Sequence, residues 1–200
     1  MADQLLTGTT LVEKESRSVG DVPVGSVIEW DDTYVNIPDG FKLCDGAVVV
    51  DPLSAYNGIA VPNYNTKYYN IPGNDWVASS PEIDNVGIGI NSFTASEDSV
   101  PARTIVQLPQ GATVTSCICY GNAGATGESW YLQEITIGGT TTVTMATAAF
   151  GTEDVTITNP TIDNETYSYV LVSDPIDTGD IIYGTLITYT PRQKFIIRIK

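Results

Sequence analysis

Closely spaced carboxylates are the groups in this 200-residue sequence that offer the widest choice of chemistry. The candidates are Asp31 and Asp32; Glu153 and Asp154; and Asp174, Asp177 and Asp180. A glycosidase needs two such acids facing each other across a cleft, about 5–9.5 Å apart. Each group instead falls in a predicted loop, where Asp side chains stabilise turns by bonding to nearby backbone. We therefore assign no catalytic residue.

The third group suits a different use. Calcium binds several oxygen ligands on a flexible segment, and DPIDTGD supplies three carboxylates, Asp174, Asp177 and Asp180. Their spacing does not match an EF-hand loop. These three residues are metal candidates, with an ordinary acidic turn as the alternative interpretation. No cofactor is expected.

Histidine is absent, and the three cysteines are Cys44, Cys117 and Cys119. The first fact removes every Ser-His and Cys-His nucleophile arrangement. Three cysteines alone cannot supply the four ligands of a structural zinc site. Cys117 and Cys119 would lie two residues apart on one face of a strand, which suits a disulfide poorly. We expect three buried thiols and a protein that is not an enzyme.

Aromatic side chains offer binding chemistry, because they can stack on the apolar face of a sugar. The candidates for receptor contact are Tyr64, Tyr68, Tyr69 and Trp76, and a second pair is Trp130 and Tyr131. Such residues are enriched in the cores of interfaces. Most Trp and Tyr side chains in small β domains are nevertheless partly buried. Both interpretations stay open here.

The charge limits the partners. The formal net charge is −15 and the sequence pI is about 4.1, so the chain should repel nucleic acid and anionic membrane surfaces. No apolar run approaches the roughly 20 residues of a membrane span, and the first residues do not resemble a secretory signal. Synthesis in the cytoplasm is expected. Four basic residues crowd the end, either as a solvated face or as a contact with an acidic neighbouring subunit: Arg192, Lys194, Arg198 and Lys200.

The elements that must position these residues are predicted to be strands. From Thr104 onward, short runs alternate apolar and polar residues with period two, and turn signals recur about every ten residues. Gly138-Gly139 predicts a tight hairpin with positive φ at both positions. About seven strands follow in residues 104–200, which is typical of a β-sandwich or jelly roll. The fold class is therefore mainly β.

The first half is predicted to be smaller and less regular. Residues 1–22 are either an arm that docks on a partner through Leu5, Leu6, Leu11 and Val12 or a disordered leader. Residues 23–75 form a small β domain with one short helix, DPLSAYNG, because Asp51-Pro52 suits a helix start and Gly58 a helix end. Residues 76–103 are a Gly-, Ser- and Asp-rich transition segment.

Two stretches, PVGSVIEW and IPDGFKLCDG, resemble the opening of the tail-collar module of tailed bacteriophages. The matching residues are Pro23, Gly25, Val27 or Ile28, Trp30, Pro38, Gly40, Phe41, Cys44 and Gly46. The resemblance implies a collar-like domain over 23–75 in which these residues are scaffold. The segment from LPQGATVT to LITYT is more loosely similar to phage β-sandwich modules. The final KFIIRIK resembles the closing strand of collar-type modules, which implies that the sandwich is an insertion.

The resemblance also implies a function. It indicates a non-enzymatic bacteriophage virion structural protein, a fibre or appendage subunit that docks by its N-terminal arm and contacts the host surface through the sandwich. Collar-type modules commonly form trimers, so a homotrimer on the virion surface is expected, with other tail or capsid proteins and a host glycan or protein as partners. The alternatives are a capsid decoration protein and, less favoured, a particle-associated glycan-active enzyme.

Overall fold

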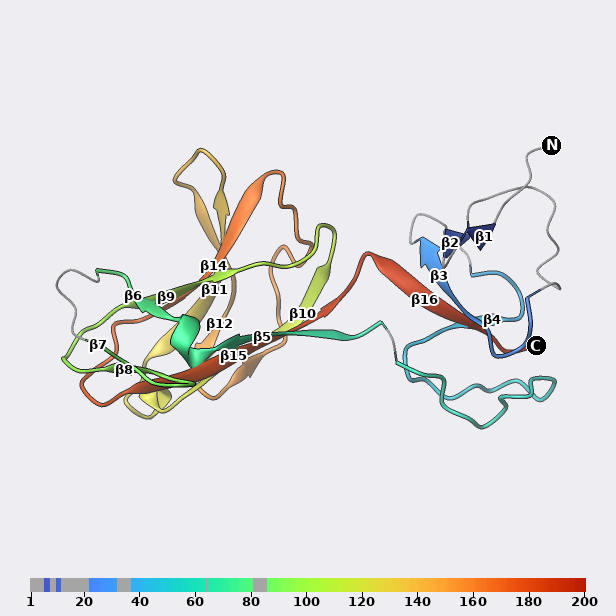
Figure 1. Ribbon diagram of the computed structural model, residues 1–200, viewed down its shortest axis with the longest axis horizontal. Helices are drawn as coiled ribbons and strands as arrows, with labels where there is room; N and C mark the ends of the chain where they lie inside the picture. The colour runs from blue at the N-terminus through green and yellow to red at the C-terminus, as the bar shows by residue number, and fades with distance from the viewer. Residues whose placement is uncertain (1–5, 8–9, 12–21, 32–36, 64, 81–85) are drawn as a thin grey trace. The chain divides into compact units, whose positions relative to one another are not determined.

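The computed structural model describes residues 6–7, 10–11, 22–31, 37–63, 65–80 and 86–200 (Figure 1). The described chain is mainly β, which confirms the predicted class. Two short 3-10 turns occur, η2 (Gly73–Asp75) and η3 (Ala123–Ala125). The strands are β1 (Leu6–Thr7), β2 (Thr10–Leu11), β3 (Val27–Asp31), β4 (Phe41–Leu43), β5 (Lys67–Pro72), β6 (Val77–Ala78), β7 (Val86–Ile88), β8 (Phe93–Ala95), β9 (Ala102–Val106), β10 (Thr113–Gly121), β11 (Ser129–Thr136), β12 (Thr142–Ala149), β13 (Glu153–Asp154), β14 (Tyr167–Ser173), β15 (Ile181–Thr190) and β16 (Gln193–Arg198).

The chain forms two compact units. The terminal unit comprises Met1–Lys67 together with Thr190–Lys200, and the inserted unit comprises Tyr68–Tyr189. These limits differ from the predicted ranges in two ways. Residues 68–103 belong to the inserted unit and contribute all or part of five of its strands, and residues 190–200 belong to the terminal unit. Among the described residues, no helix is long or apolar enough to cross a bilayer.

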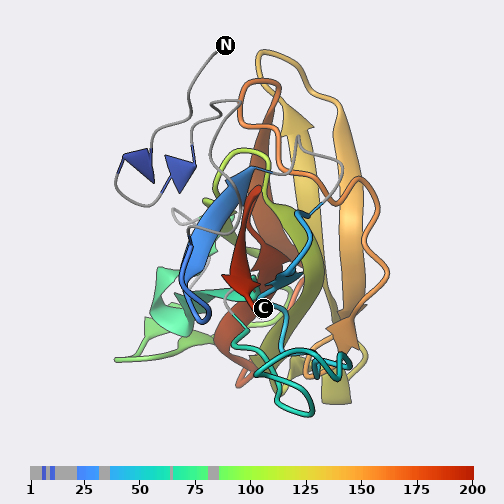
Figure 2. The same ribbon diagram turned by 90° about the vertical axis from the view of Figure 1, so that its right-hand side faces the viewer.

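The terminal unit is built on a sheet of order β1-β2-β3-β16-β4. The last strand lies between two early ones and runs antiparallel to both, with Ile196 opposite Ile28 and Leu43 (Figure 2). This pairing is the one that the resemblance of KFIIRIK to a closing strand implied. A small core cluster lies against the sheet and contains Cys44, Val49, Val61, Ile197 and Ile199.

The predicted short helix over residues 51–58 is wrong. The chain there makes successive turns: the Ser54 N–H donates to the Asp51 carbonyl at 3.0 Å, and the Asn57 N–H donates to the Ser54 carbonyl at 3.2 Å. Asp51 does accept a hydrogen bond from the Leu53 N–H, at 2.9 Å, as a cap would. The Ser54 hydroxyl donates to the Ile199 carbonyl at 2.6 Å. Asp51, which resembles a helix N-cap in the sequence, therefore stabilises a turn, and Ser54 in that turn is hydrogen-bonded to Ile199 near the end of the chain.

The inserted unit is a β-sandwich, as predicted. One sheet has the order β13-β10-β15-β8-β7, with β5 also paired to β15, and the other has the order β12-β11-β14-β9-β6. Alternation along β11 explains the layering: Trp130 and Leu132 are buried, whereas Tyr131 and Gln133 are half-buried on the outer side. The largest buried side chains of the core are Trp76, Phe93, Trp130, Leu132, Met145, Ile162, Leu171, Ile176, Ile182 and Ile187.

The predicted hairpin at Gly138-Gly139 exists, but its turn differs from the expected one. Strands β11 and β12 pair antiparallel, with Ile135 opposite Thr142. The Thr136 N–H donates to the Thr141 carbonyl at 3.0 Å, and five residues, 137–141, connect the strands. Gly138 alone has a positive φ, +74°, because a longer connection does not need both positions to be left-handed.

Candidate binding groove on the inserted unit

The sheet β12-β11-β14-β9-β6 of the inserted unit presents, on its outer face, a row of side chains from four neighbouring strands. Val77 on β6 lies opposite Arg103 on β9, which lies opposite Val172 on β14, which in turn lies opposite Tyr131 on β11. The next row pairs Ile105 with Val170 and Val170 with Gln133. Because partners across strands lie about 5 Å apart, these rows form one continuous surface.

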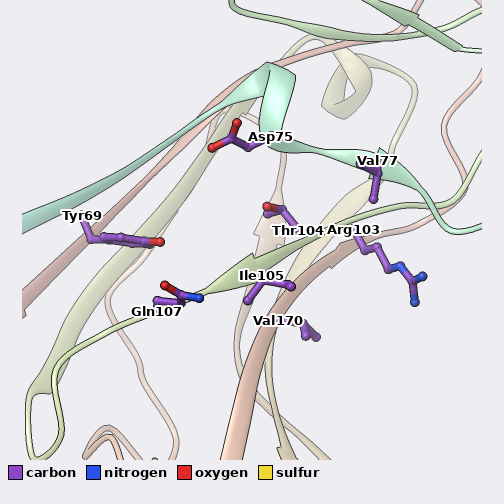
Figure 3. Close-up of a pocket in the computed structure, with 8 residues that line it drawn as sticks. All are labelled: Tyr69, Asp75, Val77, Arg103, Thr104, Ile105, Gln107 and Val170. Atoms are coloured by element: carbon purple, nitrogen blue, oxygen red, sulfur yellow. The ribbon is translucent and has the colours of Figure 1, made fainter.

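Two hollows lie along β9 and are lined by residues of this face and by core-facing residues such as Thr104 and Val106. The first has a volume of about 640 Å³, and Figure 3 labels its lining residues: Tyr69, Asp75, Val77, Arg103, Thr104, Ile105, Gln107 and Val170. The second, of about 500 Å³, adds Leu108, Ile137, Asn164, Tyr167 and Ser168, among others. The two hollows share Ile105, Gln107 and Val170. The two hollows are therefore adjacent, and we call them together the β9 groove.

The floor of the β9 groove is apolar and open to solvent. Ile105 is 68% exposed, Ile137 56% and Val77 45%. The alternation in β9 explains the first value, since Ala102, Thr104 and Val106 face the core and leave Arg103 and Ile105 outside. Strand β6 has only two residues and pairs only with Ala102 and Arg103, so it does not extend along the rest of β9.

The rim of the groove carries polar side chains with unused hydrogen-bonding capacity. Within the part of the chain that the structure describes, the side chains of Tyr69, Asp75, Arg103, Gln107 and Tyr167 make no hydrogen bond or ion pair. In Figure 3, Tyr69, Asp75 and Gln107 surround the hollow, and the Arg103 side chain extends away from Tyr69. Donors and acceptors around an apolar floor are the usual composition of a ligand site.

Asn164 closes the second hollow and is held by the loop around it. Its Nδ2 donates to the Leu108 carbonyl at 2.9 Å, and its backbone N–H donates to Gln110 Oε1 at 2.6 Å. Asp163 beside it accepts bonds from the Glu165 N–H and from Gln110 Nε2. Hydrogen bonds from Thr166 and Gln110 hold the pKa of the Asp163 carboxyl below its usual value. The groove therefore ends in a loop that is fixed by its own hydrogen bonds.

The predicted aromatic candidates divide between the groove, the exposed surface and the core. Tyr69 lines the groove, whereas Tyr68 is 63% exposed and is not among the residues that line it. Trp76 is completely buried, so its assignment as a receptor contact is wrong. The reason is packing, because the indole fills the centre of the sandwich. Tyr64 lies outside the described residues.

The second aromatic pair is structural. Trp130 is completely buried in the core. Tyr131 is half-buried, and its hydroxyl donates to the Asp174 carboxylate, with distances of 3.0 and 3.2 Å to the two oxygens. Burial and this hydrogen bond raise the pKa of the Tyr131 hydroxyl. Tyr131 therefore joins β11 to the loop after β14, and neither residue of the pair lines the two hollows.

The acidic turn does not gather its carboxylates. Asp174 accepts from the Ser129 N–H at 3.0 Å, Asp177 from the Ser99 N–H at 3.2 Å, and Asp180 from the Asp177 N–H at 3.0 Å. Among the described residues, no group of three or more His, Cys, Asp or Glu side chains could hold a metal ion. The metal hypothesis for Asp174, Asp177 and Asp180 is thus wrong, because each carboxylate serves a different backbone N–H.

The second pair of carboxylates also stabilises a turn. Asp154 accepts from the Thr147 N–H at 2.9 Å and from the Thr156 N–H at 2.7 Å. Asp31 lies in β3, and Asp32 is outside the described residues. The three cysteines are buried and form no disulfide with one another, as predicted. Burial, and then Asp45, raises the pKa of the Cys44 thiol to about 11.

The residues that carry the collar resemblance lie in the terminal unit. Gly25, Gly40 and Gly46 have φ of +93°, +84° and +82°, a conformation that favours glycine. A Cβ on Gly40 would lie 2.9 Å from the Lys200 carbonyl oxygen. Pro23, Trp30 and Pro38 lie in or beside the same sheet, and Cys44 is completely buried. Of the predicted docking residues, Leu6 and Leu11 pair across β1 and β2, whereas Leu5 and Val12 lie outside the described residues.

Comparison with known proteins gives little. No protein-family model matches the sequence, and no curated protein matches it. Two similar solved structures are the C-terminal CBM6 of LamC from Zobellia galactanivorans (11% identity, TM-score 0.40) and the xylan-binding module CBM15 (17% identity, TM-score 0.34). The alignments cover 61% and 62% of this chain, and 99% and 96% of those chains. At these scores the likeness carries no conclusion about ligand or function.

Proposed function

We propose that the inserted unit is a non-catalytic module that binds a host-surface glycan in the β9 groove, as part of a bacteriophage fibre or appendage subunit. The observation that carries this proposal is the groove itself. It combines an exposed aliphatic floor around Ile105 with a rim of polar side chains that have no partner among the described residues.

A sugar fits this arrangement because each ring has an apolar C–H face and an edge of hydroxyl groups. The face can lie on Ile105 and against the rings of Tyr69 and Tyr167, since aromatic side chains bury large apolar areas and keep a polar tip. Hydroxyl groups both donate and accept hydrogen bonds. Asp75 supplies an acceptor and Gln107 supplies both kinds of group.

Binding is favoured over cleavage by the carboxylates of the groove. Asp75 is the single carboxylate among the described residues that line the two hollows. Glycoside hydrolysis uses two acids that flank the scissile bond. The glycan-active enzyme is therefore the less favoured candidate.

The virion role rests on the collar resemblance of the terminal unit. It is supported by the positive φ at each matched glycine and by the return of the last strand into the sheet of the first. On this proposal the subunit is a homotrimer on the virion surface and is made in the host cytoplasm. It attaches to other tail or capsid proteins through residues 1–22. Capsid decoration is the alternative, and labelled antibody on intact particles would separate tail from head.

Binding of the purified protein to host surface polysaccharide, measured by titration calorimetry, tests the glycan proposal. Tyr69→Ala and Tyr167→Ala should each weaken binding by about 10-fold, equivalent to roughly 1.4 kcal/mol. Tyr68→Ala is the matched control, because Tyr68 is the neighbouring exposed residue on β5 and does not line the groove. Equal effects of all three changes, or release of sugar fragments by the protein, would contradict the proposal.

A further inference from the structure

The two units differ sharply in charge. The inserted unit contains a single basic residue, Arg103, and 14 acidic residues, whereas the terminal unit contains eight basic and ten acidic ones. Most of the net charge of −15 therefore belongs to the unit that carries the groove. At low salt, the field of such a unit extends about 30 Å into solution.

We infer that the β9 groove selects an uncharged glycan chain and excludes polyanionic ones. This inference rests on the proposed function and specifies its ligand class. A polyanionic chain that approaches the groove meets the summed repulsion of the unit before it meets any contact. An uncharged chain pays no such penalty.

The lining of the groove does not offset that repulsion. Among the described residues that line the two hollows, Asp75 and Arg103 carry the only charges, and they are opposite. A site built for a polyanion would instead place several cations along the ligand, as phosphate-binding surfaces do. A single guanidinium can donate to neutral hydroxyl groups as well as to an anion.

The remaining polar lining is uncharged and extends through both hollows. Tyr69 and Gln107 line the first, and Gln107, Asn164, Tyr167 and Ser168 line the second. Each hollow alone, at about 640 and 500 Å³, has the volume of a small-molecule site. Two such hollows in continuity fit a chain of sugar units better than one sugar.

The test compares one backbone in two charge states. A soluble neutral glucan and its carboxymethylated derivative are run in affinity electrophoresis and calorimetry with the full chain, alongside neutral and acidic fractions of host polysaccharide. Measurements at about 10 mM and about 1 M salt separate screened from unscreened repulsion. Arg103→Gln is measured with each probe.

The neutral probe should bind with a Kd that changes less than about 2-fold with salt, and the charged probe should bind at least about 10-fold more weakly at low salt. Arg103→Gln should weaken neutral binding by a few-fold at both salts. Tighter binding of the charged probe at low salt, abolished by Arg103→Gln, would overturn this inference and leave glycan binding intact. Absence of binding to every neutral and acidic fraction would instead overturn the proposed function, and this inference with it.

Discussion

Asn65 holds the returning strand of the terminal unit, and its replacement by Ala is the sharpest test of how that unit is built. The side chain is 6% exposed. Its Nδ2 donates to the Cys44 and Phe195 carbonyls, both at 3.1 Å, and its Oδ1 accepts from the Phe195 N–H at 2.7 Å. One amide thus bonds both backbone groups of Phe195 on β16, as a neighbouring strand would.

The magnitude follows from which groups lose their partners in Asn65→Ala. The Cys44 carbonyl keeps the Asn65 N–H at 3.3 Å, and the Phe195 carbonyl keeps the Cys44 N–H at 2.9 Å. The side chain makes three hydrogen bonds, and their loss at about 1 kcal/mol each gives roughly 3 kcal/mol. For a unit of this size that corresponds to a fall in Tm of about 12–24 °C.

Trypsin measures this loss selectively, because eight of the nine basic residues lie in the terminal unit and only Arg103 lies in the other. On heating, Asn65→Ala should be cut at a much lower temperature than the wild type and leave a fragment that contains the inserted unit. Asn63→Ala is the control: the exposed Asn63 side chain bonds Thr66 alone among the described residues, so its loss should cost less than about 1 kcal/mol. Equal shifts for the two variants would refute the role given to Asn65.

Three further outcomes are expected. The pKa of the Cys44 thiol is raised from 9.0 to about 11 in the folded protein. This difference contributes about 2–3 kcal/mol to the free energy of unfolding below pH 9, and the contribution is lost as the pH rises through 11. In denaturant titrations, Cys44→Ala should reduce this loss of stability at alkaline pH. Asn159→Gly keeps the positive φ of 48° but removes the 2.7 Å bond from Nδ2 to the buried Glu134 carboxylate, and should cost about 2 kcal/mol by urea unfolding. Residues 68–189 alone should fold, unfold cooperatively by circular dichroism and keep the groove's affinity, because the sandwich core lies wholly within them.

The sandwich was predictable because its strands are half-buried. In such strands successive side chains alternate between the core and the solvent, so apolar and polar residues alternate in the sequence. Residues 129–136 show this directly, with Trp130 and Leu132 inside and Tyr131 and Gln133 outside. The short helix failed for the opposite reason. A cap-like Asp51 is a local signal, and the contact from Ser54 to Ile199 that decides the conformation lies at the other end of the chain.

The groove could not be found in the sequence. Its residues come from β5, η2, β6, β9, β14 and three loops, and only the pairing of these strands brings them together. Tyr69 and Trp76 illustrate the difficulty, since both are aromatic and close in sequence, yet one lines the groove and the other fills the core. The one usable sequence signal was Ile105, an aliphatic residue that alternates along the chain with the polar residues Arg103 and Gln107. Alternate residues of a strand lie on the same face, so Ile105 is expected to be exposed together with Arg103.

The two units differ in surface charge, and this difference supports the proposal that one attaches the subunit and the other binds the ligand. The terminal unit is nearly balanced in charge and exposes aliphatic side chains in residues 47–60, with Val50 at 88% and Leu53 at 84% exposure. Such surfaces are typical of contacts with other proteins. The inserted unit is strongly acidic, which keeps it solvated and repels non-specific polyanions. These surfaces support the proposal that the terminal unit attaches the subunit and that the inserted unit binds the ligand.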